Sequence, residues 1–170
     1  IESLLKTLKD SSKYHISEIR NVELSTLFSA ILASDADKVY PVFDIARLGA
    51  LHPHASSAMS KAGNIQNIFT KCFQLLQSEG MSNATILTSS RFLVNCFRYD
   101  DLRVALLSPP ITTAVTDDLK NNRLKVLLAI CEAHCGSTNK SVRVSIANLI
   151  CNIALSVFKI PEFKSLIFNT

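Results

Sequence analysis

Tryptophan is absent from the 170-residue sequence, and glycine and proline are scarce, with four and five residues. So few turn-forming residues argue against a loop-rich β protein, a collagen-like chain or a low-complexity linker. Charged residues make up 19% of the sequence and hydrophobic residues 48%, a balance that excludes intrinsic disorder. The length predicts one domain, and nine phenylalanines predict a core of aliphatic and Phe side chains.

Long apolar runs are missing as well. No stretch of about 18 apolar residues is present, so the sequence predicts no membrane-spanning helix. The first residues also lack the pattern of a secretory signal peptide. The five cysteines are odd in number and mostly lie within apolar helical pattern, which suits buried thiols in a reducing compartment better than disulfides. The cysteine usage therefore predicts an intracellular protein. Because the chain starts at Ile1 and stops after an apolar segment at Thr170, we expect a piece of a longer protein.

Apolar residues recur with a spacing of about 3.6 along nearly the whole chain, and no segment alternates cleanly between apolar and polar residues. Pro41 marks a helix start, Asn64 an N-cap, and Gly80 and the pair at 109–110 mark breaks. The predicted fold class is all-α. The expected helices cover residues 1–9, 16–32 or 23–32, 41–52, 65–77, 82–97, 100–107, 112–120, 121–134 and 140–158, with a short turn at 56–61 and a last helix beginning at Pro161.

Two of the expected helices resemble each other. Residues 90–97 (SRFLVNCF) and 147–154 (ANLICNIA) share an apolar body with Asn at the same place. Arg47 and Arg91 are 44 residues apart, and Asn95 and Asn152 are 57 apart. Armadillo and HEAT units repeat about every 40–47 residues. We therefore predict an armadillo/HEAT-like α-solenoid of about four helical repeats, with a compact helical bundle as the alternative.

A stripe of polar residues crosses the otherwise apolar helix 82–97. A rotation of about 100° per residue places Arg91, Asn95 and Arg98 on one narrow face. A helix that is apolar on most sides is buried between layers, so its polar stripe must face a groove or satisfied partners. In a solenoid such stripes line the concave surface, and we predict a groove there.

The helix expected at 140–158 has a similar stripe, which contains Asn148 and Asn152, and Arg47 shares a face with Asp44 on an earlier helix. An Asn amide can both donate to and accept from an extended peptide backbone, while Arg binds carboxylate or phosphate through two parallel hydrogen bonds. The alternative for each Asn is a cap or a bridge to a neighbouring helix. Arg47 can likewise pair with Asp44.

The sequence contains no complete catalytic or metal-binding motif. Cys131, His134 and Cys135 stand close together, but zinc requires a fourth ligand of this kind and none is evident. The sequence has no glycine-rich phosphate loop and no hydrolase motif, so we predict neither enzyme activity nor a cofactor. Residues 61–170 have a net charge of +5, which favours an acidic partner. Nucleic acid is disfavoured because the aromatic residues lie within the apolar pattern.

Three stretches resemble the PUL domain, the C-terminal module of phospholipase-activating protein and its fungal relatives. Residues 40–53 (YPVFDIARLGALHP) are similar to the family's FPALDILRL…HP, and residues 90–97 to its RTFCNCF. Residues 139–152 (NKSVRVSIANLICN) are similar to its NKNIHIALATLALN. The first stretch is fairly specific, whereas the other two are shared with armadillo-like repeats in general. The resemblance covers most of residues 20–160, and we expect 1–170 to be a single PUL domain whose C-terminal repeats are missing.

The resemblance implies an armadillo-like array whose basic concave groove binds the C-terminal tail of the AAA+ segregase valosin-containing protein, in ubiquitin-dependent protein turnover in cytoplasm and nucleus. Ubiquitin-pathway components would be reached through other domains of the parent, and no membrane is involved. PUL modules also occur fused to thioredoxin-like or ubiquitin-like-protease domains. A structural or oligomerising scaffold is the alternative function. The residues expected to bind the peptide are Arg47, Arg91, Asn95, Arg98, Asn148 and Asn152.

Overall fold

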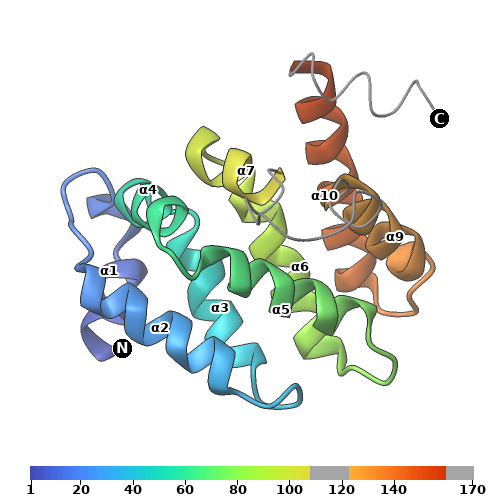
Figure 1. The fold of residues 1–170 in the computed structure, drawn as a ribbon, viewed down its shortest axis with the longest axis horizontal. Coiled ribbons are helices and arrows are strands. Elements are labelled where there is room, and N and C mark those ends of the chain that lie inside the picture. Colours follow the sequence, from blue (N-terminus) through green and yellow to red (C-terminus); the bar gives the residue numbers. More distant parts are fainter. Residues whose placement is uncertain (108–122, 160–170) are drawn as a thin grey trace, which may run out of the picture.

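The computed structural model describes residues 1–107 and 123–159. This part of the chain forms nine α-helices and one short 3-10 helix, η1, and contains no strand (Figure 1). None of these helices combines the length and hydropathy that crossing a bilayer requires. The elements are α1 (Glu2–Lys9), η1 (Ser11–Lys13), α2 (Asn21–Ala33), α3 (Tyr40–Gly49), α4 (Pro53–Lys61), α5 (Ile65–Gln77), α6 (Asn83–Cys96), α7 (Asp100–Leu107), α9 (Arg123–Cys135) and α10 (Lys140–Lys159).

The helices stack in rows that repeat along the molecule. An inner row consists of α3, α6 and α10, in which α6 packs extensively against both of its neighbours. A second row consists of α2, α5 and α9, and α4 contacts α7 to form a third. Each of the three units thus contributes one helix to the inner row and one to the second. This arrangement is the predicted α-solenoid rather than a compact bundle, with α1 packed against α3 at the N-terminal end.

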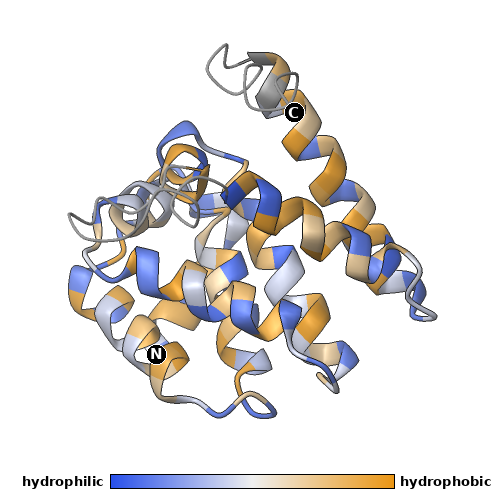
Figure 2. Cartoon of the chain, turned by 45° about the vertical axis from the view of Figure 1, so that its right-hand side comes forward, coloured by the Kyte–Doolittle hydropathy of each residue, from blue (hydrophilic) through white to orange (hydrophobic). Residues whose placement is uncertain are grey.

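Aromatic rings connect the inner and second rows. Phe92 of α6 lies between Phe43 of α3 and Phe69 of α5, with ring centroids 5.6 and 6.0 Å away. All three side chains are buried, and tilted rings at these separations are favourable. Hydrophobic residues gather where helices meet, and hydrophilic ones surround them (Figure 2). The predicted aliphatic and Phe core is confirmed.

The segment around His52 differs from the predicted helix 41–52. α3 ends at Gly49, and α4 begins at Pro53, so that the expected short turn at 56–61 is the second half of a helix. A residue before proline avoids the helical region, and His52 accordingly adopts an extended conformation, with φ −87° and ψ 123°. Its Nδ1 accepts from the backbone N–H of Ala55 at 3.3 Å and caps α4. Histidine is an unusual N-cap, which is why the sequence pattern did not reveal this helix.

Other boundaries agree with the prediction. α5 covers residues 65–77 as expected, and α6 begins after Ser82, whose Oγ accepts from the N–H of Thr85. Asn139 caps α10 by accepting from two backbone N–H groups. The helix expected at 112–120 and the one beginning at Pro161 lie outside the described residues.

Candidate functional site

The inner helices run in the same direction, and side chains of one helix bind backbone carbonyls of the previous one. Asn95, near the end of α6, donates from Nδ2 to the carbonyl oxygen of Arg47 at 2.8 Å. Tyr99 donates from its hydroxyl to the carbonyl of Leu51 at 3.1 Å. The last carbonyls of a helix have no partner within the helix. The bond from Asn95 therefore satisfies the end of α3, and the bond from Tyr99 fixes the residues that follow α3 against those that follow α6.

The same kind of contact joins α10 to α6. Asn152 donates from Nδ2 to the carbonyl of Val94 at 3.2 Å, and the hydroxyls of Ser90 and Ser145 lie 2.8 Å apart. Both serines are buried, and because Ser90 Oγ donates to the carbonyl of Leu87 at 3.1 Å, it accepts from the hydroxyl of Ser145. Polar side chains thus hold three inner helices side by side at a fixed register.

A groove of about 240 Å³ lies where these three helices meet. It brings together four of the six predicted binding residues, one from α3, two from α6 and one from α10. The helical stripe derived from the sequence explains why they point to the same side. The lining consists of Arg47, Leu51, Arg91, Val94, Asn95, Ser141, Val144, Ser145 and Asn148.

The groove carries excess positive charge. Arg91 is exposed and has no ion pair with any described residue. Arg47 is more enclosed, with 24% of its side chain exposed, and its Nε lies 2.5 Å from Oδ1 of Asp44. Asp44 is the single acidic residue of α3, α6 and α10. An anionic ligand therefore meets one free guanidinium and a second that can turn from Asp44.

Two predicted residues are not part of this lining. Arg98 follows α6 at its end, where its guanidinium lies 6.0 Å from the ring centroid of Tyr99. Asn152 is half-buried and uses its amide on Val94, as the bridging alternative expects. The same holds for the Nδ2 donor of Asn95, although Asn95 also lines the groove. Asn148 is exposed and has no hydrogen bond with the described residues.

The apolar lining residues were missed by sequence reasoning, which sought polar groups. Val94 is adjacent to Asn95, and Val144 lies four residues before Asn148 on the same face of α10. Their positions in the helical stripe were a signal that could have revealed them. Val144 is 51% exposed and offers an apolar contact beside the basic groups.

The family model of the PUL domain matches residues 1–166. The chain is a PUL domain. This bears out the resemblance seen at residues 40–53, 90–97 and 139–152. No curated protein and no solved structure is matched by this sequence.

The PUL domain is a protein-interaction module without catalytic activity, and the expected absence of an enzyme function is confirmed on that ground. The cysteines fit this role. Burial raises the pKa of the Cys131 thiol to about 11 and raises the pKa values of Cys72 and Cys96 strongly. A thiol held in its neutral form is a poor nucleophile. His134, which precedes Cys135 in the sequence, is hydrogen-bonded through Nε2 to the carbonyl oxygen of Leu76 at 2.7 Å.

No group of three or more metal-binding side chains occurs within the described parts of this PUL domain. All five cysteines are free thiols, of which Cys135 and Cys151 are exposed. The site is therefore best described by its two chemical properties. It presents positive charge at Arg47 and Arg91, and it presents amide groups at Asn95 and Asn148.

Proposed function

We propose that this PUL domain binds the acidic, extended C-terminal tail of a AAA+ segregase of the valosin-containing-protein type in the groove between α3, α6 and α10. The observation that carries the proposal is the exposed, unpaired guanidinium of Arg91 at a groove shared by all three units. A binding module whose groove has a surplus of positive charge is complementary to a carboxylate-rich segment. The family's role as an interaction module supports the assignment.

Arg91 is the main anchor for a tail carboxylate in this proposal, because its charge is not already compensated. Arg47 adds a second anchor by exchanging Asp44 for a ligand carboxylate. Asn148 holds the peptide backbone with its free amide, and Asn95 contributes the amide atoms that its bond to Arg47 leaves available. Arg98 lies just beyond the end of α6 and attracts the acidic tail over a longer range.

The cellular setting belongs to the same proposal. The domain would recruit the segregase in ubiquitin-dependent protein turnover, in cytoplasm and nucleus, while other domains of the parent protein contact ubiquitin-pathway components. A parent with a thioredoxin-like or ubiquitin-like-protease domain would use the groove in the same way.

A helical-repeat scaffold is the second candidate function. It is favoured by the bonds that Asn95 and Asn152 make to neighbouring helices, since these show that part of each polar stripe serves the packing. It does not account for Arg91 and Asn148, whose side chains make no ion pair or hydrogen bond with the residues that the structure describes. The two functions therefore make different predictions for those residues.

Fluorescence anisotropy with a labelled segregase tail peptide tests the proposal. We expect micromolar binding that weakens with added salt, because exposed charges are screened. Arg91→Glu should weaken binding at least about tenfold, since a charge-assisted contact is replaced by repulsion. Lys9→Glu, which makes the same charge change on an exposed residue of α1, should bind as the wild type does. Circular dichroism must show that both variants are folded.

Binding that is unaffected by Arg91→Glu, or that falls equally in Lys9→Glu, would contradict the groove and indicate a nonspecific charge effect. Absence of binding by the folded wild type, even at low salt, would favour the scaffold.

A further inference from the structure

The two arginines of the inner groove differ in the charge that surrounds them. Arg91 forms no ion pair with a described residue, whereas Nε of Arg47 donates to Oδ1 of Asp44 at 2.5 Å. Asp44 and Arg47 are three residues apart on α3, so their side chains lie on the same face of that helix. The groove therefore offers one uncompensated guanidinium and one whose charge is already balanced.

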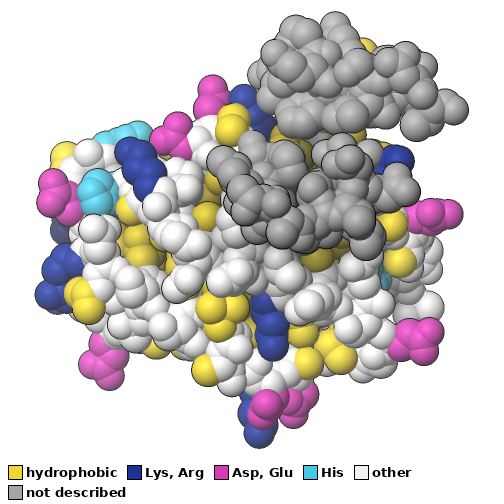
Figure 3. All heavy atoms as spheres, viewed as in Figure 1, with side chains coloured by type: hydrophobic (Ala, Val, Ile, Leu, Met, Phe, Trp, Pro, Cys, Tyr) yellow, Lys and Arg dark blue, Asp and Glu magenta, His cyan; other side chains and the backbone are white. Residues whose placement is uncertain are grey.

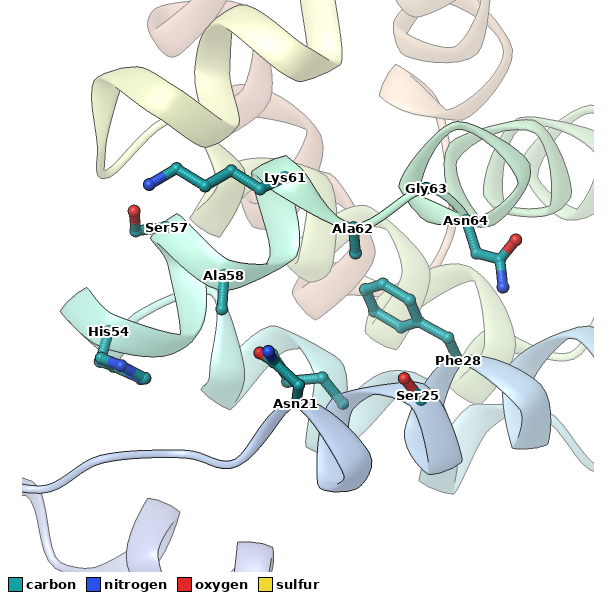
Figure 4. A pocket seen from close by; sticks show the side chains of 11 residues that line it. Asn21, Ser25, Phe28, His54, Ser57, Ala58, Lys61, Ala62, Gly63 and Asn64 are labelled. Atoms are coloured by element: carbon teal, nitrogen blue, oxygen red, sulfur yellow. The ribbon is translucent and has the colours of Figure 1, made fainter.

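A carboxylate this close to a groove residue occurs once among the inner helices, because Asp44 is the single acidic residue of α3, α6 and α10. On the face of the molecule seen in Figure 3, acidic side chains lie toward the margin. The hollow between α2 and α4 is larger, about 530 Å³, but Lys61 is its one lining lysine or arginine (Figure 4). Of these two cavities, the groove is the one that combines two guanidiniums with an adjacent carboxylate.

The Asp44 side chain can leave Arg47 without disturbing the core. It is 44% exposed, while the Arg47 side chain is 24% exposed. Asp44 engages Nε alone, and the two Nη groups of Arg47 make no hydrogen bond with a described residue. An ion pair of this kind is weak, because water solvates the exposed partner. The Asp44 carboxylate can therefore turn into solvent while Arg47 remains in the lining of the groove.

A ligand carboxylate that approaches Arg47 encounters Asp44 in either of two geometries. If it binds the edge of the guanidinium that contains Nε, it must displace Asp44. If it binds the edge formed by the two Nη groups, it lies close to Asp44, and two carboxylates at one guanidinium repel each other. Asp44 opposes ligand binding at Arg47 in both geometries. Arg91 has no such carboxylate bound to it.

We propose that Asp44 is a specificity-determining residue of the inner groove, which competes with the ligand for Arg47. Because the ligand is the acidic tail of the proposed function, this role rests on that function. A segment with one carboxylate binds Arg91 and leaves the pair of Asp44 and Arg47 intact. A second carboxylate reaches Arg47 only when Asp44 is released, so it contributes less to the affinity than the first. Recognition then depends mainly on the carboxylate at Arg91.

Fluorescence anisotropy with the labelled segregase tail peptide tests this competition. Asp44→Asn removes the competing charge and keeps a side chain of similar shape, and we expect it to tighten binding about threefold. Asp37→Asn makes the same charge change on an exposed, unpaired residue outside the groove and should bind as the wild type does. Asp44→Glu, which keeps a carboxylate three residues before Arg47, should remove the gain. Circular dichroism checks that each variant is folded.

A combination with Arg47→Met shows whether Asp44 acts through Arg47. In that background, Asp44→Asn should change the affinity by less than about 1.5-fold in about 0.15 M salt, where charges that are not in contact are largely screened. Tail peptides whose acidic residues are replaced by their amides, one at a time, identify the carboxylate concerned. One replacement should weaken binding more in Asp44→Asn than in the wild type, because it removes the carboxylate that reaches Arg47.

Unchanged binding by folded Asp44→Asn would overturn the competition, and weaker binding would instead assign Asp44 to orienting Arg47. A gain of the same size in Asp37→Asn, or in the Arg47→Met background, would overturn it in favour of a general charge effect. Each of these results leaves the proposed function intact as long as the wild type binds and Arg91→Glu weakens that binding. Absence of binding by both the wild type and Asp44→Asn would overturn both proposals.

Discussion

The side-chain amide of Asn95 on α6 donates to the backbone carbonyl of Arg47 on α3, with 2.8 Å between nitrogen and oxygen. A predicted ligand-binding Asn is thus also a structural one. Because Arg47 and Asn95 both line the groove, this bond fixes the distance between its walls. The packing of the solenoid and the shape of the groove depend on the same contact.

Asn95→Ala should lower the free energy of unfolding by about 1–3 kcal/mol, since it leaves the half-buried carbonyl of Arg47 without this partner. Urea denaturation measures the change. Asn148→Ala is the matched control, because Asn148 is exposed and unbonded, and its stability should stay within about 0.5 kcal/mol of the wild type. The same Asn148→Ala variant should bind the tail peptide more weakly. Equal stability of the two variants would show that the Asn95 bond contributes little.

Phe92→Ala should cost about 3–5 kcal/mol, because Phe92 is fully buried between Phe43 and Phe69. Thermal unfolding followed by circular dichroism measures the loss. Phe158→Ala, on a residue that is 68% exposed, tests whether any loss of a Phe has this effect. A similar drop for both would contradict the assignment of Phe92 to the core.

His52 should make stability depend on pH. Burial lowers the pKa of this imidazole, with further contributions from His54 and His15, and its Nδ1 must be unprotonated to cap α4. Protons therefore bind the unfolded chain more readily than the folded one. This contribution is fully present above the ordinary histidine pKa of about 6.5 and is lost as the pH falls below it toward the lowered folded value.

Urea unfolding between pH 7.5 and about 5 tests this effect, with a limiting slope of about 1.4 kcal/mol per pH unit for one histidine. His52→Asn replaces the ring by a residue that caps helices without titrating. The variant should be less stable at neutral pH, because it loses the contact with Tyr14, but its slope should be shallower. An unchanged slope would show that another group governs the dependence.

Cysteine reactivity should divide the five thiols into two classes. Cys135 and Cys151 are exposed, whereas Cys72, Cys96 and Cys131 are buried with raised pKa values. A short pulse of iodoacetamide followed by mass spectrometry should modify the first two and spare the other three until urea is added. Rapid modification of Cys72 in native buffer would contradict the burial of α5 against α6.

The fold could be predicted in large part because its signals are local. Asn64 and Gly80 mark the two ends of α5 in the sequence. The spacing of apolar residues predicts which helix faces form the core. The sequence pattern does not predict α4 as a full helix, because it places Pro53 at the end of one helix, whereas α3 ends at Gly49 and Pro53 begins α4. A proline marks a boundary, but the pattern alone does not say on which side the chain is helical.

The candidate site was predictable only to the extent that residues share a face of one helix. Arg91 and Asn95 are on one stripe and do meet at the groove, but Asn152 turns to Val94. Which side of the stripe touches the neighbouring helix depends on packing between units, and the sequence of one helix does not specify it.

Because Arg47, Arg91 and Asn148 belong to α3, α6 and α10, a ligand that contacts all three touches every unit at once. Each unit of a solenoid contacts only its neighbours, so the curvature of the array is set by the interfaces between successive units. A tail peptide bound across all three units would then restrict changes in that curvature. A pulling force on that tail would be transmitted to the interfaces between units, where Asn95 bonds to Arg47 and Asn152 bonds to Val94.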